Sequence, residues 1–293
     1  MLDHPLQDLE SWVLYFSGVE LPILRLTARR LDEARLNIDA VSGRDIARIV
    51  LNDPLMAVRV LAYIQPFRGR HLRSDITTIA SAVMMLGVEP FFEKFDHPLT
   101  IEAMLAEEPQ ALIGVLQLVR RVQRAARYAH EWAFARHDVN VEEVTLAALL
   151  HDLSEILLWC FSPQLAMEVR TLQLRDKALR STLAQEKILG IRLADLQFAL
   201  CRAWHLPDLL KLLMDDAHAD QPRVRNVALA VNLARHSANG WTDAALPDDF
   251  AAIEKLLHIS HETLISRLCL PPEALPPPMA SPDDGVPASA PPD

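Results

Sequence analysis

Apolar residues recur at spacings of three and four almost throughout the chain up to residue 270. This period is that of one face of an α-helix, and no segment alternates apolar and polar residues as a half-buried strand would. Only eight residues are glycine, well under half the usual share of about 7%, which disfavours Gly-rich phosphate loops and tight hairpins. Because no repeat of fixed period is present, the sequence predicts an irregular all-α multi-helix bundle rather than a solenoid.

Local signals mark several helix ends. Ser42 precedes Asp45 at the spacing of a capping box, and Asp53 with the proline after it supplies an N-cap and a first-turn proline for a helix through Leu61. Gly87 is placed to close a helix that begins near residues 74–78. Further helices are predicted over Leu21–Leu36, Leu112–Ala135, Val141–Phe161, Gln164–Leu174, Ser181–Leu189, Leu193–Trp204, Pro207–Met214, Arg223–Ser237, Phe250–Leu257 and His261–Leu268.

The end of the sequence differs from the rest in composition. The segment from Pro271 to Asp293 holds nine of the twenty prolines, four acidic residues and no basic residue. Such a segment buries too little apolar surface to offset the entropy of ordering it. We therefore expect a disordered, proline-rich acidic tail over residues 270–293 and one all-α domain over residues 14–269.

No feature of the sequence indicates a membrane protein. The first residues lack a basic stretch followed by an apolar run, as a secretory signal would have. The longest apolar stretch, Val141–Phe161, carries Glu142, Glu143, His151, Asp152 and Glu155, which is too many ionisable groups for a bilayer span. We expect this stretch to be a buried core helix and the protein to be cytoplasmic.

Net charge and cysteine content exclude further classes. With 29 basic and 39 acidic side chains the net charge is −10, which disfavours general binding to nucleic acid. The three cysteines, Cys160, Cys201 and Cys269, are odd in number and have no C-x-x-C spacing, so they predict neither a disulfide framework nor a thiolate zinc site. Motifs of nucleotide kinases, dinucleotide oxidoreductases, serine hydrolases and zincin proteases do not occur.

The segment from Ser42 to Gln65 has the outline of a helix-turn-helix. The start of its second helix, from Pro54 to Val58, offers no side chain that donates to a base edge. Core packing is therefore the favoured interpretation of these two helices.

Four arginines lie on the helix predicted over 112–135, namely Arg120, Arg121, Arg124 and Arg127, with Arg136 after them. Positions 120, 124 and 127 share one face, where forked guanidinium donors can receive phosphate or carboxylate oxygens. A solvated helix face balanced by nearby acids is the simpler interpretation, and the four arginines are kept as a candidate docking patch.

His151 and Asp152 stand side by side in the most apolar part of the chain. An imidazole and a carboxylate both coordinate divalent metals, and such a metal would activate water against a phosphodiester. Two ligands do not make a metal site, so the residues that face this pair decide its role.

The stretch from Leu149 to Glu155 resembles the His-Asp signature of the HD phosphohydrolase superfamily. From about residue 14 to about 218 the chain more specifically resembles the HDOD family, the HD-related output domain of bacterial signalling proteins, with a looser continuation to 269. The motifs that carry this resemblance are Leu21–Leu24, Ile46–Val50, Asp53–Met56, Ile79–Gly87, Glu186–Gly190 and Ala203–Pro207. The resemblance implies an all-α fold of HD type.

The sequence departs from the catalytic pattern at the positions that would bind metal. The resemblance implies ligand positions at Gln117, a poor ligand for the metals concerned, and at Leu193, which has no donor atom. Of a later His pair only His218 remains, and Ser154 and Glu155 replace the residues that commonly follow the His-Asp pair. These departures predict no catalytic residue, no bound metal and no cofactor.

We interpret His151 and Asp152 as a vestigial pair that forms structural hydrogen bonds, and we place them with His218 in a candidate pocket. A retained binding site for a small ligand such as a nucleotide is the alternative interpretation of this pocket. The sequence then supports two functional hypotheses. The first is a non-catalytic signal-transduction protein that binds one or more signalling proteins, with a homodimer as one possible state. The second is a metal-dependent HD-type phosphohydrolase or phosphodiesterase that acts on a nucleotide or cyclic dinucleotide.

Overall fold

The computed structural model describes residues 1–67, 75–176, 179–268 and 270. Throughout these residues the regular structure is helical, which confirms the predicted all-α class. The only extended pairing among them is one isolated parallel bridge between Ile23 and Thr100. The proline-rich tail predicted from the sequence lies outside the described residues.

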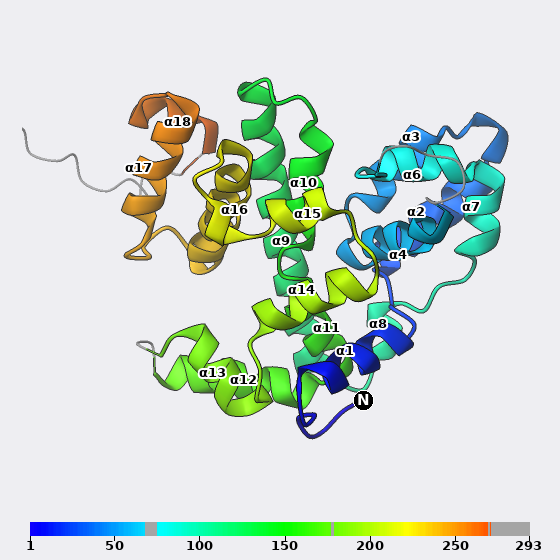
Figure 1. Cartoon of the computed structure of the whole chain (residues 1–293), viewed down its shortest axis with the longest axis horizontal. Coiled ribbons are helices and arrows are strands. Elements are labelled where there is room, and N and C mark those ends of the chain that lie inside the picture. Colours follow the sequence, from blue (N-terminus) through cyan, green and yellow to red (C-terminus); the bar gives the residue numbers. More distant parts are fainter. Residues whose placement is uncertain (68–74, 177–178, 269, 271–293) are drawn as a thin grey trace, which may run out of the picture.

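A group of short helices lies at one end of the molecule, shown in blue and cyan in Figure 1. It contains α2 (Arg25–Arg35), α3 (Gly43–Val50), α4 (Pro54–Ile64), α6 (Ile79–Leu86) and α7 (Val88–Lys94), with the 3-10 turns η1 (Ile38–Ala40) and η2 (Gln65–Phe67). The short helix α8 (Ile101–Met104) follows this group in the chain. The predicted caps are present. Ser42 and Asp45 form a reciprocal capping box, Thr78 caps α6, and Gly87 ends α6 with φ of 89°.

A buried carboxylate ties this group together. Asp53 is completely buried and accepts hydrogen bonds from the backbone N–H groups of Leu55 and Met56, at the start of α4, and of Leu24. Burial raises the pKa of Asp53, and the hydrogen bonds that it accepts oppose the rise. The bond to Leu24 holds residues 21–24 outside helix α2, whereas the sequence predicted a helix from Leu21.

The centre of the molecule is built on one long helix, α9 (Pro109–Ala135). Helices α10 (Val141–Leu150), α11 (Leu153–Phe161) and α16 (Pro222–His236) pack against it. Gly114 of α9 permits the close approach of α11, because a Cβ atom there would lie 2.4 Å from the ring of Trp159.

The remaining helices surround this centre (Figure 1). They are α1 (Leu9–Gly18), α12 (Pro163–Arg175), α13 (Ser181–Leu189), α14 (Leu193–Ala203), α15 (Asp208–Leu213), α17 (Leu246–Leu257) and α18 (His261–Leu268), with the turns η3 (Asp216–His218) and η4 (Ser237–Asn239). Helix α1 packs on α14, and it buries Trp12 and Phe16 completely. The helical body therefore extends before residue 14, where the sequence placed the start of the domain.

The helix predicted over Val141–Phe161 is interrupted, which is the main correction to the sequence-based assignment. The structure ends α10 at Leu150 and begins α11 at Leu153, so His151 and Asp152 stand at the break. By length and composition the whole segment could cross a membrane, but 83% of its most apolar window is buried in the protein. Such burial is typical of a core helix of a soluble domain.

Because Gly114 lies against the ring of Trp159, we predict that Gly114→Ala destabilises the protein by about 1–3 kcal/mol through overpacking. Gly18 is the matched control, since it is also helical and a Cβ atom there would meet nothing within 4 Å. Gly18→Ala should leave stability unchanged or raise it slightly. Chemical denaturation of both variants measures the difference, and equal midpoints would contradict this packing.

Candidate functional site

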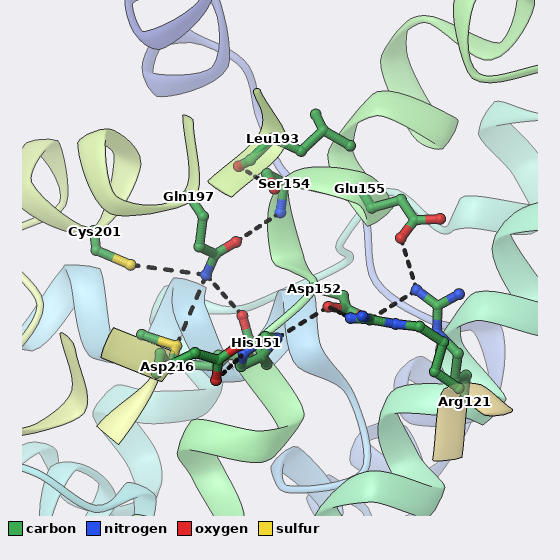
Figure 2. A network of polar contacts seen from close by, with 12 residues as sticks. Arg121, His151, Asp152, Ser154, Glu155, Leu193, Gln197, Cys201 and Asp216 are labelled. Carbon is green, nitrogen blue, oxygen red and sulfur yellow. Dashed lines mark hydrogen bonds and ion pairs between the residues drawn. The ribbon is translucent and has the colours of Figure 1, made fainter. Parts of the chain in front are cut away.

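The break between α10 and α11 is held by a side-chain amide from another helix. In a continuous helix the N–H of Ser154 would donate to the C=O of Leu150. Here Gln197 of α14 lies between them: its Oε1 accepts from Ser154 N at 2.8 Å, and its Nε2 donates to Leu150 O at 2.8 Å (Figure 2). The amide thus replaces a bond of the helix ladder, a recognised cause of helix kinks.

Sequence reasoning did not identify Gln197. The available signal was a single amide on an otherwise apolar face of α14, where Leu193, Leu196, Leu200 and Cys201 are all buried. The hydroxyl of Ser154 also donates to the backbone O of Leu193 at 2.9 Å, so α14 holds the start of α11 at two points. These bonds fix where His151 and Asp152 leave the helix.

Asp152 is surrounded by cationic groups. Its Oδ2 accepts from Nη2 of Arg121 at 2.7 Å, its Oδ1 lies 3.0 Å from Nδ1 of His151, and Nη2 of Arg235 is 3.6 Å from Oδ1. Only 10% of the Asp152 side chain is exposed. Burial by itself would raise the pKa of Asp152, but Arg121, His151 and Arg235 outweigh that effect and hold the pKa well below its ordinary value. Asp152 is therefore a carboxylate at neutral pH.

Arg121 reaches this site from α9 and contacts two acids at once. Its Nη2 lies 2.7 Å from Asp152 and 2.7 Å from Oε2 of Glu155, one turn along α11. The side chain of Arg121 is 20% exposed. A partly buried guanidinium that bridges two carboxylates supplies the positive charge that both acids need.

His151 lies between two carboxylates. Opposite Asp152, its Nε2 is 3.7 Å from Oδ1 of Asp216 in η3, a distance of ion pairing rather than of direct hydrogen bonding. Burial lowers the pKa of the imidazole, but the hydrogen bond to Asp152 and the negative charges of Asp152 and Asp216 outweigh burial and raise the pKa to about 9. The ring is thus an imidazolium at neutral pH, with a proton on each nitrogen.

The six ionised side chains around the break form what we call the His–Asp cluster, and its charges balance. The three cations are Arg121, Arg235 and the His151 imidazolium, and the three anions are Asp152, Glu155 and Asp216.

These residues do not fit a divalent metal as they stand. Both oxygens of Asp152 already face a guanidinium, because Nη2 of Arg121 lies 2.7 Å from Oδ2 and Nη2 of Arg235 lies 3.6 Å from Oδ1. Within residues 1–67, 75–176, 179–268 and 270, no group of three or more His, Cys, Asp or Glu side chains is placed to hold a metal ion.

The other residues singled out in the sequence lie apart from this cluster. Gln117 is exposed on α9, where its Oε1 accepts from Nη2 of Arg170 at 3.3 Å. Leu193 is buried and takes part only through its backbone. His218 pairs with Asp215 at 3.1 Å and is 49% exposed, so it is Asp216 rather than His218 that approaches His151.

The candidate docking patch divides into two parts. Arg121 points inward to the His–Asp cluster, whereas Arg120 and Arg127 are exposed and Arg124 is partly exposed. Arg127 has Glu131 at 3.9 Å, and no ion pair of Arg120 or Arg124 is found within the described chain. We call Arg120, Arg124 and Arg127 the α9 arginine face.

Comparison with known proteins places this geometry in context. The model of the HDOD domain family matches residues 21–220. The fold is similar to that of the MmoQ response regulator of Methylococcus capsulatus str. Bath, at TM-score 0.64 and 18% identity over 87% of this chain and 100% of that one. It is also similar to a virulence factor of Campylobacter jejuni subsp. jejuni, at TM-score 0.65 and 20% identity over 91% of this chain and 96% of that one. No curated protein matches the chain.

We predict that the imidazole of His151 titrates near pH 9 in the folded protein, because the two flanking carboxylates raise its pKa. An unfolded histidine titrates near about 6.5. Protonation therefore stabilises the fold fully below about pH 6.5, and this contribution is lost as the pH rises through about 9. NMR titration of the ring carbon signals measures the pKa directly.

Asp216→Asn is the matched control for this titration, because it removes one flanking charge and leaves Asp152 in place. The variant should lower the pKa of His151. A His151 that titrates below about 6.5 would mean that burial outweighs the carboxylates and that the ring is neutral.

Proposed function

Since the chain belongs to the HDOD domain family, we propose that it is a non-catalytic signal-transduction protein that acts by binding other proteins. The single observation that carries this proposal is the ion pairing of His151 and Asp152. Their charges are met by Arg121, Arg235 and Asp216 rather than left open to a metal and substrate. A hydrolase of HD type would need both groups as free metal ligands.

The similar structures support a role in signalling. One is named a response regulator and the other a virulence factor, and both share the fold over most of their length. We carry the regulatory role to this chain as part of the proposal, and with it a cytoplasmic location in a bacterium.

We place the contact with partner proteins on the α9 arginine face. Its guanidinium groups project from one rigid helix, and Arg120 and Arg124 are without an ion pair inside the described residues. Arginine is enriched at the centres of protein interfaces because it combines charge with a broad, forked donor surface. An acidic segment of a partner is the chemistry that suits such a face.

We predict that the purified protein holds no stoichiometric transition metal and does not hydrolyse cyclic dinucleotides in added manganese. The physical reason is that Arg121 and Arg235 already pair with Asp152, and Asp216 faces His151. Elemental analysis and product chromatography provide the two readouts.

His151→Ala is the matched blank, and its hydrolysis rate should equal that of the native protein. The native protein could instead hold one metal ion per chain and hydrolyse cyclic dinucleotides, with both the metal and the hydrolysis lost in His151→Ala. That result would contradict this proposal and support the phosphohydrolase hypothesis.

A further inference from the structure

The α9 arginine face belongs to a longer strip of positive charge. At its upstream end Arg170 of α12 lies against Gln117, which precedes Arg120 by one turn. From Gln117 to Arg127 the strip follows α9 for about 15 Å, at about 1.5 Å per residue. At its downstream end Glu131 is the only acid paired with it in the described chain.

The sequence contains a segment of complementary charge. Residues 271–293 carry Glu273, Asp283, Asp284 and Asp293 and no basic residue. They account for four of the ten net negative charges of the chain. Their prolines favour an extended backbone that leaves side chains accessible and reduces the entropy lost on docking.

Of the two helices that precede this segment, α17 contacts the end of α9. Nη1 of Arg136, at the end of α9, donates to the backbone O of Leu256 in α17 at 3.4 Å, and α18 packs on α17. The segment therefore starts one short helix beyond the contact at Arg136, which itself follows Arg127, the last arginine of the strip, by nine residues. Figure 1 shows α17 and α18 on the same side of the molecule as α16, which itself packs on α9.

The distances are compatible with contact within one chain. Helix α18 is about 12 Å long, and Arg127 precedes Arg136 along α9 by about 14 Å. An extended proline-rich backbone from Leu270 to Asp283 spans about 40 Å, at about 3.1 Å per residue. Asp283 and Asp284 can therefore reach Arg127 and Arg124.

We propose that the acidic, proline-rich segment 271–293 docks on the α9 arginine face of its own chain and so competes with the partner for that face. The proposal rests on the role of this face given under Proposed function. It makes the protein autoinhibited: an acidic partner must displace an acidic segment that is always present.

The contact between the segment and the α9 arginine face consists of individually weak ion pairs. Each exposed Arg–carboxylate pair contributes no more than about 1 kcal/mol and is screened by salt. Because the segment is tethered, its effective concentration is of millimolar order. Three such pairs correspond to a dissociation constant of about 6 mM or weaker, so the contact is occupied only part of the time. A partner with more acidic residues then displaces the segment without unfolding anything.

A spin label at position 280 tests the contact in the full-length protein. The label is attached to Ala280→Cys in a Cys269→Ser background, since the described cysteines Cys160 and Cys201 are buried and unreactive. We expect paramagnetic broadening of the amide signals of Arg120–Arg127 in low salt. The broadening should disappear in 0.5 M salt, because the Debye screening length there is about threefold shorter than in 0.05 M salt. Amides near the exposed Arg29 and Arg30 of α2 should not broaden.

Two further samples make the result decisive. The four acids Glu273, Asp283, Asp284 and Asp293 are replaced by their amides in one sample. This variant should lose the broadening and bind a deca-glutamate peptide up to about 2-fold more tightly, because competition is removed. In a mixture of spin-labelled chains with isotope-labelled chains, the label and the observed amides are on different molecules. The amide signals of the isotope-labelled chain should then show no broadening.

Broadening in the mixed sample would assign the face to the segment of a second copy and overturn the intrachain contact. Absent broadening, or equal broadening near Arg29, would overturn the docking itself. Neither readout involves metal or hydrolysis, so either failure is distinguishable from failure of the proposed function.

Discussion

The ion pair between Arg121 and Asp152 is the interaction on which the site depends. It brings a guanidinium from α9 to a carboxylate at the break between α10 and α11, with 2.7 Å between the atoms. A buried carboxylate without that partner would be an uncompensated charge, which is among the most destabilising defects in a folded protein. Arg121 lowers the pKa of Asp152, and the carboxylates of Asp152 and Asp216 in turn raise the pKa of His151.

The helix break and the ion pair support each other. Gln197 satisfies the two backbone groups that a continuous helix would have joined, so the break leaves neither of them without a hydrogen bond. The break turns Asp152 toward Arg121 and leaves Glu155 one turn further along α11, where the same guanidinium reaches it. Because α14 carries Gln197 and also packs on α1, the geometry of the cluster is tied to the packing of the first helix.

The sequence predicted the fold better than the site, for a physical reason. The spacing of apolar residues along a helix and the residues that cap its ends are local features of the sequence. The helices and the capping roles of Ser42 and Asp53 could therefore be recognised from neighbouring residues. The break at His151 depends on an amide 43 residues away from Ser154, which no local pattern reveals. The resemblance placed the metal-ligand position of α9 at Gln117, whereas the residue of α9 that meets Asp152 is Arg121, one turn later.

A double-mutant cycle on Arg121 and Asp152 tests the central claim most directly. The free energy of unfolding is measured by denaturant titration for the native protein, Arg121→Gln, Asp152→Asn and the double variant. If the guanidinium holds the carboxylate in place of a metal, the coupling energy between the two positions should be about 2–3 kcal/mol. A coupling energy below about 0.5 kcal/mol, the limit of additivity for independent sites, would contradict the claim.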